Sequence, residues 1–466
     1  MKLKELTLKN FRCYPDLTIE FQSQVTVLIA ANGEGKTSIL DALRIAFWPF
    51  VSQFDLARTA YNDPANGIQI DDVLVLRPDA SHVQIKEQIA RQLPCEINTK
   101  CEFNHEILSW TRVRKSEAKR SQTIDGEGVS KVKKLAQTLQ KQVRNLEDTH
   151  LDLPLFGYYG TGRLWQHKRL TQSKKNATDR KNQKVRTFAY RDCLDPASSY
   201  REFEEWFISI YKTAREEQIQ ALEQGDQLSL QDTPYFSLIK VIQDAINTVL
   251  EPVGWHDLEF SQKLDASLAL NHKEQGKLKV SQLSDGIKNM LGLVADIAYR
   301  CVLLNGHLLE NAAKETQGVI MIDEVDMHLH PIWQQMVVSS LTKAFPSLQF
   351  ILTTHSPQVL STIDAKDIRI LVDGMVYSAP AGSKGAESSR LLNRIFKVDS
   401  RPPHDPNTLL LKQYEKLVYD DMWDSEEALE LRHQLNEIFA NEEPKLTELD
   451  LHIENRQWEK ELEKSK

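Results

Sequence analysis

Cysteines and long apolar runs are scarce in this sequence, and their scarcity excludes several classes of protein. The five cysteines among 466 residues are scattered, and none forms a CxxC pair. We therefore expect neither a disulfide framework nor a zinc site, and a reducing cytoplasm is the expected location. No run of about 18 or more apolar residues occurs, so we expect no transmembrane span and no membrane partner. Residues Met1–Leu8 alternate like a strand and lack the apolar core of a signal peptide.

Charge of one sign does not dominate the whole chain, but it dominates two of its segments. The net charge is -8. Residues 112–191 carry 20 Lys and Arg against 7 Asp and Glu, whereas residues 401–466 carry 9 against 17. The basic middle, above all the polar stretch 168–186, is a candidate for binding nucleic acid, and the acidic tail is a candidate for a basic partner. A solvated face with a flexible loop explains the basic middle equally well.

A glycine-rich loop near the N-terminus has the pattern of a phosphate-binding loop. The apolar run Val25–Ile29 precedes residues 30–37, AANGEGKT, and helical spacing of apolar residues follows until Pro49. Backbone N–H groups of such a loop cradle polyphosphate, with Lys36 on the β and γ phosphates and Thr37 on Mg²⁺. The usual GxxxxGK[ST] pattern begins with glycine, whereas Ala30 stands here. The predicted ATP contacts of this loop are Asn32, Gly33, Glu34, Gly35, Lys36, Thr37 and Ser38.

A second half of the same site is expected almost three hundred residues later. Asp323 and Glu324 follow the apolar run Val319–Ile322, so both carboxylates lie at the end of a strand. We expect Asp323 to bind Mg²⁺ and Glu324 to polarise the water that attacks the γ-phosphate. Two exposed acids at the start of a helix are the alternative interpretation.

Four further residues or motifs are candidates for phosphate contact. Ser284, Asp285 and Gly286 stand where a helix begins, with Ser284 placed to cap it. His355 ends a strand and could sense the γ-phosphate. Arg12 and Arg163 lie in loops beside expected strands, where each could touch phosphate or pair with acids.

Composition and periodicity suggest four segments. Residues 1–110 form an N-terminal lobe, 111–255 a basic and mostly helical insertion, 256–400 a second lobe, and 401–466 an acidic helical tail. The last two strands are expected at Val319–Ile322 and Leu348–Leu352. The tail reads as two or three helices, one of them beginning at Asp424 and Glu427, which have capping-box spacing.

Taken together, these motifs resemble the ABC-type ATPase heads of the SMC, RecF-like and OLD-like group. The matching residues are Asn10-Phe11-Arg12, residues 32–37, Leu283-Ser284-Asp285-Gly286, Asp323-Glu324 and Thr354-His355-Ser356-Pro357. The resemblance implies an α/β fold with a mixed sheet, a parallel-stranded nucleotide-binding core, a helical insertion and a helical tail. It also implies an ATPase that uses Mg²⁺ and forms a head-to-head dimer or a higher even-numbered oligomer, in which Ser284, Asp285 and Gly286 face the γ-phosphate of the second copy.

A narrower resemblance points to the PtuA family, the ATPase subunits of Septu or retron-associated antiphage defence. It rests on residues 158–163, on His328-Leu329-His330-Pro331 and on the acidic tail. OLD nucleases carry a Toprim domain, whose acidic residues are missing after His355, so no nuclease site is expected in this chain. The resemblance implies instead a separately encoded HNH-type nuclease that docks on the tail. A RecF-like repair ATPase that binds DNA directly, and a nucleotide-locked scaffold with negligible hydrolysis, remain alternatives.

Overall fold

The computed structural model describes residues 1–57, 63–76, 89–118, 120–145, 150–163, 185–196, 200–225, 229 and 233–464. The chain forms two compact units, Met1–Ser388 and Ser389–Lys466. The four segment boundaries predicted above remain predictions. The predicted insertion, however, supplies a strand to the central sheet.

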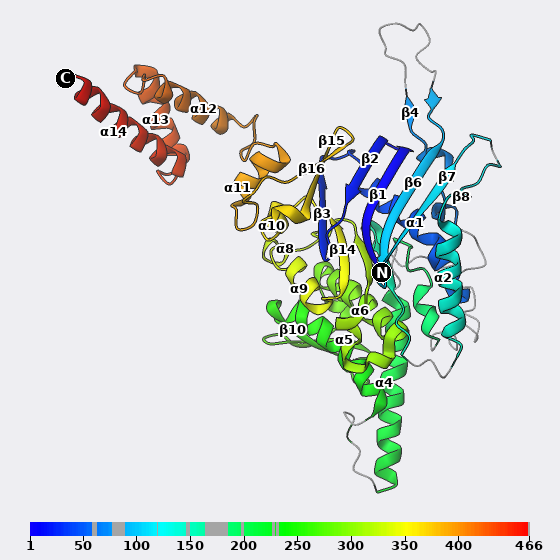
Figure 1. Cartoon of the computed structure of the whole chain (residues 1–466). Coiled ribbons are helices and arrows are strands. Elements are labelled where there is room, and N and C mark those ends of the chain that lie inside the picture. Colours follow the sequence, from blue (N-terminus) through cyan, green and yellow to red (C-terminus); the bar gives the residue numbers. More distant parts are fainter. Residues whose placement is uncertain are drawn as a thin grey trace. The chain divides into compact units, whose positions relative to one another are not determined.

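A six-stranded sheet forms the centre of the first unit (Figure 1). Its five parallel strands have their carboxyl ends on one edge, and a sixth strand pairs antiparallel. Four of the parallel strands are buried at every position, as expected for apolar strands that are covered on both faces. The strand order is β16 (Met375–Ser378), β15 (Ile368–Val372), β3 (Val25–Ala30), β14 (Leu348–Thr353), β13 (Gly318–Ile322) and β9 (Leu155–Tyr159).

A five-stranded antiparallel sheet accompanies this core, and helix α1 (Lys36–Val51) contacts both sheets. The Phe47 ring of α1 lies 4.8 Å from the Phe156 ring of β9. The Trp110 indole of the antiparallel sheet donates to the Ala46 carbonyl at 2.7 Å. The order of the antiparallel sheet is β2 (Tyr14–Glu20), β1 (Lys2–Phe11), β6 (Cys95–Phe103), β7 (Glu106–Arg114) and β8 (Ile124–Asp125).

Helix α6 (Asp285–Asn305) is buried along most of its length and is anchored to the central sheet. Within it, Arg300 Nε donates to Asp296 Oδ2 at 2.8 Å, and the Tyr159 hydroxyl of β9 donates to the same oxygen at 2.8 Å. The buried Asp296 carboxylate is thus paired with Arg300 of the same helix, as a buried charge requires. Its second hydrogen bond, from Tyr159, connects α6 to β9. The other elements of the first unit are α2 (Val129–Gln142), α4 (Tyr200–Glu223), α5 (Pro234–Leu250), α7 (Ala312–Glu315), α8 (Pro331–Gln334), α9 (Val337–Ala344), α10 (Pro357–Leu360), a sheet of β10 (Trp255–Ser261), β11 (Ser267–His272) and β12 (Gly276–Lys279), and the pair β4 (Val75–Leu76) and β5 (Ala90–Arg91).

Two predictions about elements of the first unit were wrong. Strand β14 is not the last strand, because β15 and β16 follow it as a hairpin. Its turn, Asp373-Gly374, has positive φ at both residues, which is the geometry of a two-residue hairpin loop. Helix α1 also continues through Pro49 to Val51, because proline in the last turn removes only one hydrogen bond and Ser52 N–H still reaches the Trp48 carbonyl.

Among its described residues, the second unit contains three long helices with a core of their own. Ser425, rather than Asp424, caps the middle helix, since its Oγ accepts from the Ala428 N–H at 3.2 Å. The helices are α12 (Pro406–Tyr419), α13 (Glu426–Ile438) and α14 (Pro444–Lys464), preceded by the short α11 (Ser388–Leu391). Its fully or nearly buried residues include Leu411, Tyr414, Val418, Ala428, Leu435 and Leu449. Across the described ranges, the helices are too short or too polar to cross a bilayer.

Candidate nucleotide-binding site

The loop between β3 and α1 has the backbone of a phosphate-binding loop. Gly33 and Gly35 have φ angles of 90° and 87°, which disfavour residues with a Cβ. A Cβ on Gly35 would lie 2.5 Å from Cys13 Sγ, so this position also lacks space. Ala30, in place of the usual first glycine, ends β3 in extended conformation and needs no positive φ. The departure from the common pattern is therefore compatible with the loop.

Lys36 is buried at the start of α1, and among the described residues its direct hydrogen-bond partners are carbonyl oxygens. Its Nζ donates to the Ala30 carbonyl at 2.8 Å and to the Ala31 carbonyl at 3.3 Å, and the residue is 8% exposed. Burial lowers its pKa, although the carboxylates of Asp323 and Glu324 act against that shift. An ammonium group held in this way at a helix N-terminus is poised to exchange a carbonyl for a phosphate oxygen.

The two halves that are distant in the sequence meet at Thr37 and Asp323. Thr37 Oγ1 donates to Asp323 Oδ2 at 2.9 Å, and Thr353 Oγ1 donates to Asp323 Oδ1 at 2.5 Å. Asp323 is 3% exposed. A hydroxyl and one carboxylate fit Mg²⁺, which uses few protein oxygens and completes its shell with water and substrate phosphates. The described residues contain no group of three or more His, Cys, Asp or Glu arranged to hold a metal ion.

Glu324 follows directly, in a backbone conformation that is unusual for its residue type. Its φ is 48°, in the left-handed region. Its N–H donates to Thr353 Oγ1 at 2.7 Å, and its carbonyl accepts from Arg163 Nη2 at 2.7 Å. The side chain is half-buried, and its carboxylate makes no hydrogen bond to any described residue. It is therefore available to a water molecule.

Arg12 and Arg163 differ from each other in their surroundings. Arg12 pairs with acids, with Nη1 2.7 Å from Asp41 Oδ2 and Nε 2.9 Å from Asp72 Oδ1. Burial lowers the Arg12 pKa, but these two carboxylates outweigh it and leave the pKa raised. Arg163 pairs with no acid among the described residues; it donates to the carbonyls of Gly160, after β9, and of Asp323 and Glu324, after β13, and burial lowers its pKa to about 10.

The remaining predicted residues occupy the loop and two element ends. Asn32 and Gly33 are exposed, Ser38 Oγ lies 3.4 Å from Arg12 Nη1, and Glu34 Oε2 accepts from the Asp373 N–H at 3.0 Å. His355 is half-buried just after β14. Ser284 and Asp285 are exposed at the start of α6, and Ser284 makes no side-chain cap, contrary to expectation. Gly286 packs against the His328 carbonyl, where a Cβ would come within 2.6 Å.

Sequence reasoning missed the residues that support this site. Thr353, Asn289 and Asp41 each bond a predicted site residue. Of the three, Asp41 had a signal in the sequence, because it lies four positions after Thr37 on the same helix and therefore on the same face. The predicted nucleic-acid segment 168–186 lies outside the described residues except for its last two. Of these, Arg186 Nε donates to the Leu304 carbonyl at 2.8 Å.

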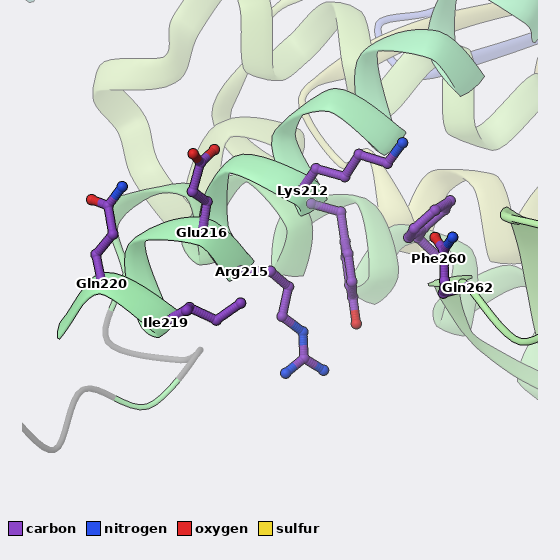
Figure 2. Close-up of a pocket in the computed structure, with 8 residues that line it drawn as sticks. Lys212, Arg215, Glu216, Ile219, Gln220, Phe260 and Gln262 are labelled. Carbon is purple, nitrogen blue, oxygen red and sulfur yellow. The ribbon is translucent and has the colours of Figure 1, made fainter. Parts of the chain in front are cut away.

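A separate surface cavity of about 560 Å³ lies between α4 and β10 (Figure 2). It contains none of the predicted nucleotide contacts. Lys212 Nζ lies 5.1 Å from the Phe260 ring centroid, and Arg215 Cζ lies 5.7 Å from that of Tyr211. Its lining is Tyr211, Lys212, Arg215, Glu216, Ile219, Gln220, Phe260 and Gln262.

This arrangement defines an ATPase with a phosphate-binding loop, and comparison with known families agrees. A family model described as "AAA domain" matches residues 5–251, more than half of the chain, and a second AAA-domain model matches residues 167–361. The chain belongs to this AAA-domain family and is an ATPase. The α/β fold predicted from the sequence, with its mixed sheet and parallel core, is confirmed.

Some similar proteins are named as retron ATPases and others as Septu proteins. "Retron Ec83 probable ATPase" of Escherichia coli is 28% identical over 511 residues, covering 100% of this chain and 89% of that protein. "Retron Vc95 probable ATPase" of Vibrio cholerae is 25% identical and covers 93% of this chain and 86% of that protein. "Septu protein PtuA" of Bacillus mycoides is 35% identical over 97 residues, 20% of this chain and 13% of that protein. The predicted similarity to PtuA and retron-associated ATPases is confirmed.

Proposed function

We propose that this chain is the Mg²⁺-dependent ATPase subunit of an antiphage defence complex and that it regulates a separate nuclease. The 2.9 Å hydrogen bond between Thr37 and Asp323 is the observation that carries the ATP site. It brings the phosphate-binding loop, which follows β3, to Asp323, which follows β13 two strands away in the central sheet. The retron and Septu names of the similar proteins support the assignment to defence.

In this proposal each site residue has a distinct task. Lys36 and the N–H groups that precede the first turn of α1 bind the β and γ phosphates, with Asn32, Gly33, Glu34, Gly35 and Ser38 completing the loop. Thr37 and Asp323 hold Mg²⁺, which neutralises charge on the phosphates when bound. Glu324 orients and deprotonates the attacking water, His355 contacts the γ-phosphate, and Arg12 supports the loop through Ser38 and Asp41.

Ser284, Asp285 and Gly286 are proposed to complete the site of a second copy. The Ser284 side chain is exposed and is not used to cap α6, and the first N–H groups of an α-helix have no partner within the helix. An anion approaching along the axis of α6 would meet the positive end of a 21-residue helix. The γ-phosphate of a facing protomer supplies such an anion, which makes ATP binding an assembly step.

We expect Ser284→Arg to block ATP-dependent dimerisation, because a long cation in place of the hydroxyl keeps the two heads apart. Light scattering coupled to size exclusion should show an ATP-bound dimer for Glu324→Gln. It should show a monomer when Ser284→Arg is added. Ser339→Arg, on the exposed face of α9, is the matched control and should leave the dimer intact. A dimer that survives Ser284→Arg would contradict this interface.

The second unit is proposed as the docking element for an HNH-type nuclease. Its buried core residues lie within residues 411–449, whereas Leu429, Leu451 and Trp458 are 61%, 57% and 64% exposed. Acidic residues outnumber basic ones by 17 to 9 in residues 401–466, so a partner with basic and apolar contacts is favoured.

Deleting the residues after Arg401 is expected to abolish co-purification with the nuclease, while ATP affinity stays within about twofold of the full chain. Pull-down of the co-expressed nuclease and a nucleotide titration measure the two effects. Co-purification of the shortened chain at full stoichiometry would exclude this docking site. Direct DNA binding by residues 168–186 and a non-hydrolysing scaffold both remain alternative predictions, and measurable turnover would exclude the second.

A further inference from the structure

Arg163 is a buried cation that is bonded to backbone and amide oxygens instead of carboxylates. It is 8% exposed. Nη1 donates to the carbonyls of Gly160, at 3.0 Å, and of Asp323, and Nη2 donates to the Glu324 carbonyl at 2.7 Å. Nε donates to Asn289 Oδ1 at 3.2 Å. Four of the five N–H donors of a guanidinium are thus used, and two of them hold the turn that carries the expected base.

This turn needs support because Glu324 has a φ of 48°, which is unfavourable for an L-residue with a side chain. Two hydrogen bonds supply that support, one on each side of its Cα. Thr353 Oγ1 accepts from the Glu324 N–H at 2.7 Å, and Arg163 donates to the Glu324 carbonyl at 2.7 Å. With both flanking peptide groups held, the direction of the Cα–Cβ bond is fixed, and so is the region that the carboxylate can reach.

We propose that Arg163 is a positioning residue for ATP hydrolysis, acting through the backbone of Glu324. The inference rests on the proposed function, in which Glu324 activates the attacking water. A general base must lie within hydrogen-bond reach of its water, and a displacement of about 1 Å can lower a rate about 100-fold. Lys36 Nζ bonds the Ala30 and Ala31 carbonyls and none of the groups that Arg163 holds, so we expect Arg163 to govern the chemical step more than affinity.

Asn289 connects Arg163 to the helix whose first residues face outward. Asn289 lies on α6, accepts from Arg163 Nε and donates from Nδ2 to the Met327 carbonyl at 3.2 Å. The first turns of α6, which begin at Ser284, are therefore joined to the turn that carries Glu324. A contact made at Ser284 by a second copy has a short covalent and hydrogen-bonded path to the base.

We expect Arg163→Met to lower kcat about 100-fold while the Kd for ATP changes less than about threefold. Arg163→Lys, which keeps the buried charge but not the planar fork, should lie between Arg163→Met and the unaltered chain. Single-turnover hydrolysis and a fluorescent-nucleotide titration measure the two quantities. In a Glu324→Gln background, Arg163→Met should cause no further loss, because the two residues act as one unit.

Arg369→Met is the matched control for the loss of a buried guanidinium. Arg369 is also 8% exposed, and its hydrogen-bond partners among the described residues are the carbonyls of Glu20, Lys366 and Ile368, none of which belongs to the site. It should leave kcat unchanged even where it lowers the melting temperature. If Arg163→Met does not fold, Arg163→Lys carries the test in the same assay.

Two results would overturn the inference. The first is an unaltered kcat in the folded Arg163 variants. The second is a double variant, Arg163→Met with Glu324→Gln, whose fold-loss in kcat equals the product of the two single losses. Failure of the proposed function would look different. The unaltered chain would then not bind ATP, or Glu324→Gln would hydrolyse ATP at the unaltered rate.

Discussion

Replacing Lys36 with alanine is expected to abolish ATP binding at micromolar nucleotide. The ammonium group is the one cation held directly by the loop carbonyls, at 2.8 Å and 3.3 Å, in the part of the chain that the structure describes. A charge-assisted hydrogen bond contributes about 1.5–3 kcal/mol, and phosphate can accept more than one from Lys36. Because each 1.4 kcal/mol is tenfold in affinity, we expect Kd to rise about 100-fold or more. Isothermal titration with Mg²⁺ and ATP measures this change.

Lys343→Ala provides the comparison for Lys36→Ala. Lys343 is an exposed lysine on α9, so its loss removes the same charge without touching the loop. We expect Kd for ATP to stay within about twofold in that variant. Unchanged affinity in Lys36→Ala would mean that the loop is not the phosphate site.

Glu324→Gln is expected to retain ATP binding and to lower kcat about 10²–10⁴-fold, the usual contribution of a general base. Glutamine has nearly the same shape and leaves the hydrogen bonds of the Glu324 backbone in place, but it cannot accept a proton. The ATP-bound state should therefore accumulate as a dimer. Phosphate release under single-turnover conditions measures the effect, and Glu315→Gln, an exposed acid at the end of α7, should turn over at the unaltered rate.

The sequence predicted the central part of the fold because its signals there are local and repeated. Val25–Ile29 and Val319–Ile322 are apolar runs that lead into polar residues with distinct chemistry, and this pattern is typical of buried parallel strands. Their placement two strands apart, with β14 between them, explains how Thr37 can reach Asp323 across almost three hundred residues.

The parts that could not be predicted depend on contacts between distant segments. Nothing in the residues around Arg163 indicates that its partners are the Asp323 and Glu324 carbonyls. Every residue has a backbone carbonyl, so the sequence does not show which carbonyls a side-chain donor will bond. Thr353 likewise carries no motif of its own, yet it bonds both Asp323 and the Glu324 N–H. Ser284 is the reverse case. Its position predicted that its side chain caps the helix, but in the structure this side chain makes no cap hydrogen bond to α6.

The most direct test of the whole account compares nucleotide binding and cleavage in three chains under identical conditions. ATP is titrated at fixed Mg²⁺, and γ-phosphate release is then followed in a single turnover. The account predicts that the unaltered chain binds and cleaves ATP, that Glu324→Gln binds without cleaving, and that Lys36→Ala does neither. Unaltered affinity in Lys36→Ala, or cleavage by Glu324→Gln at the unaltered rate, would contradict it.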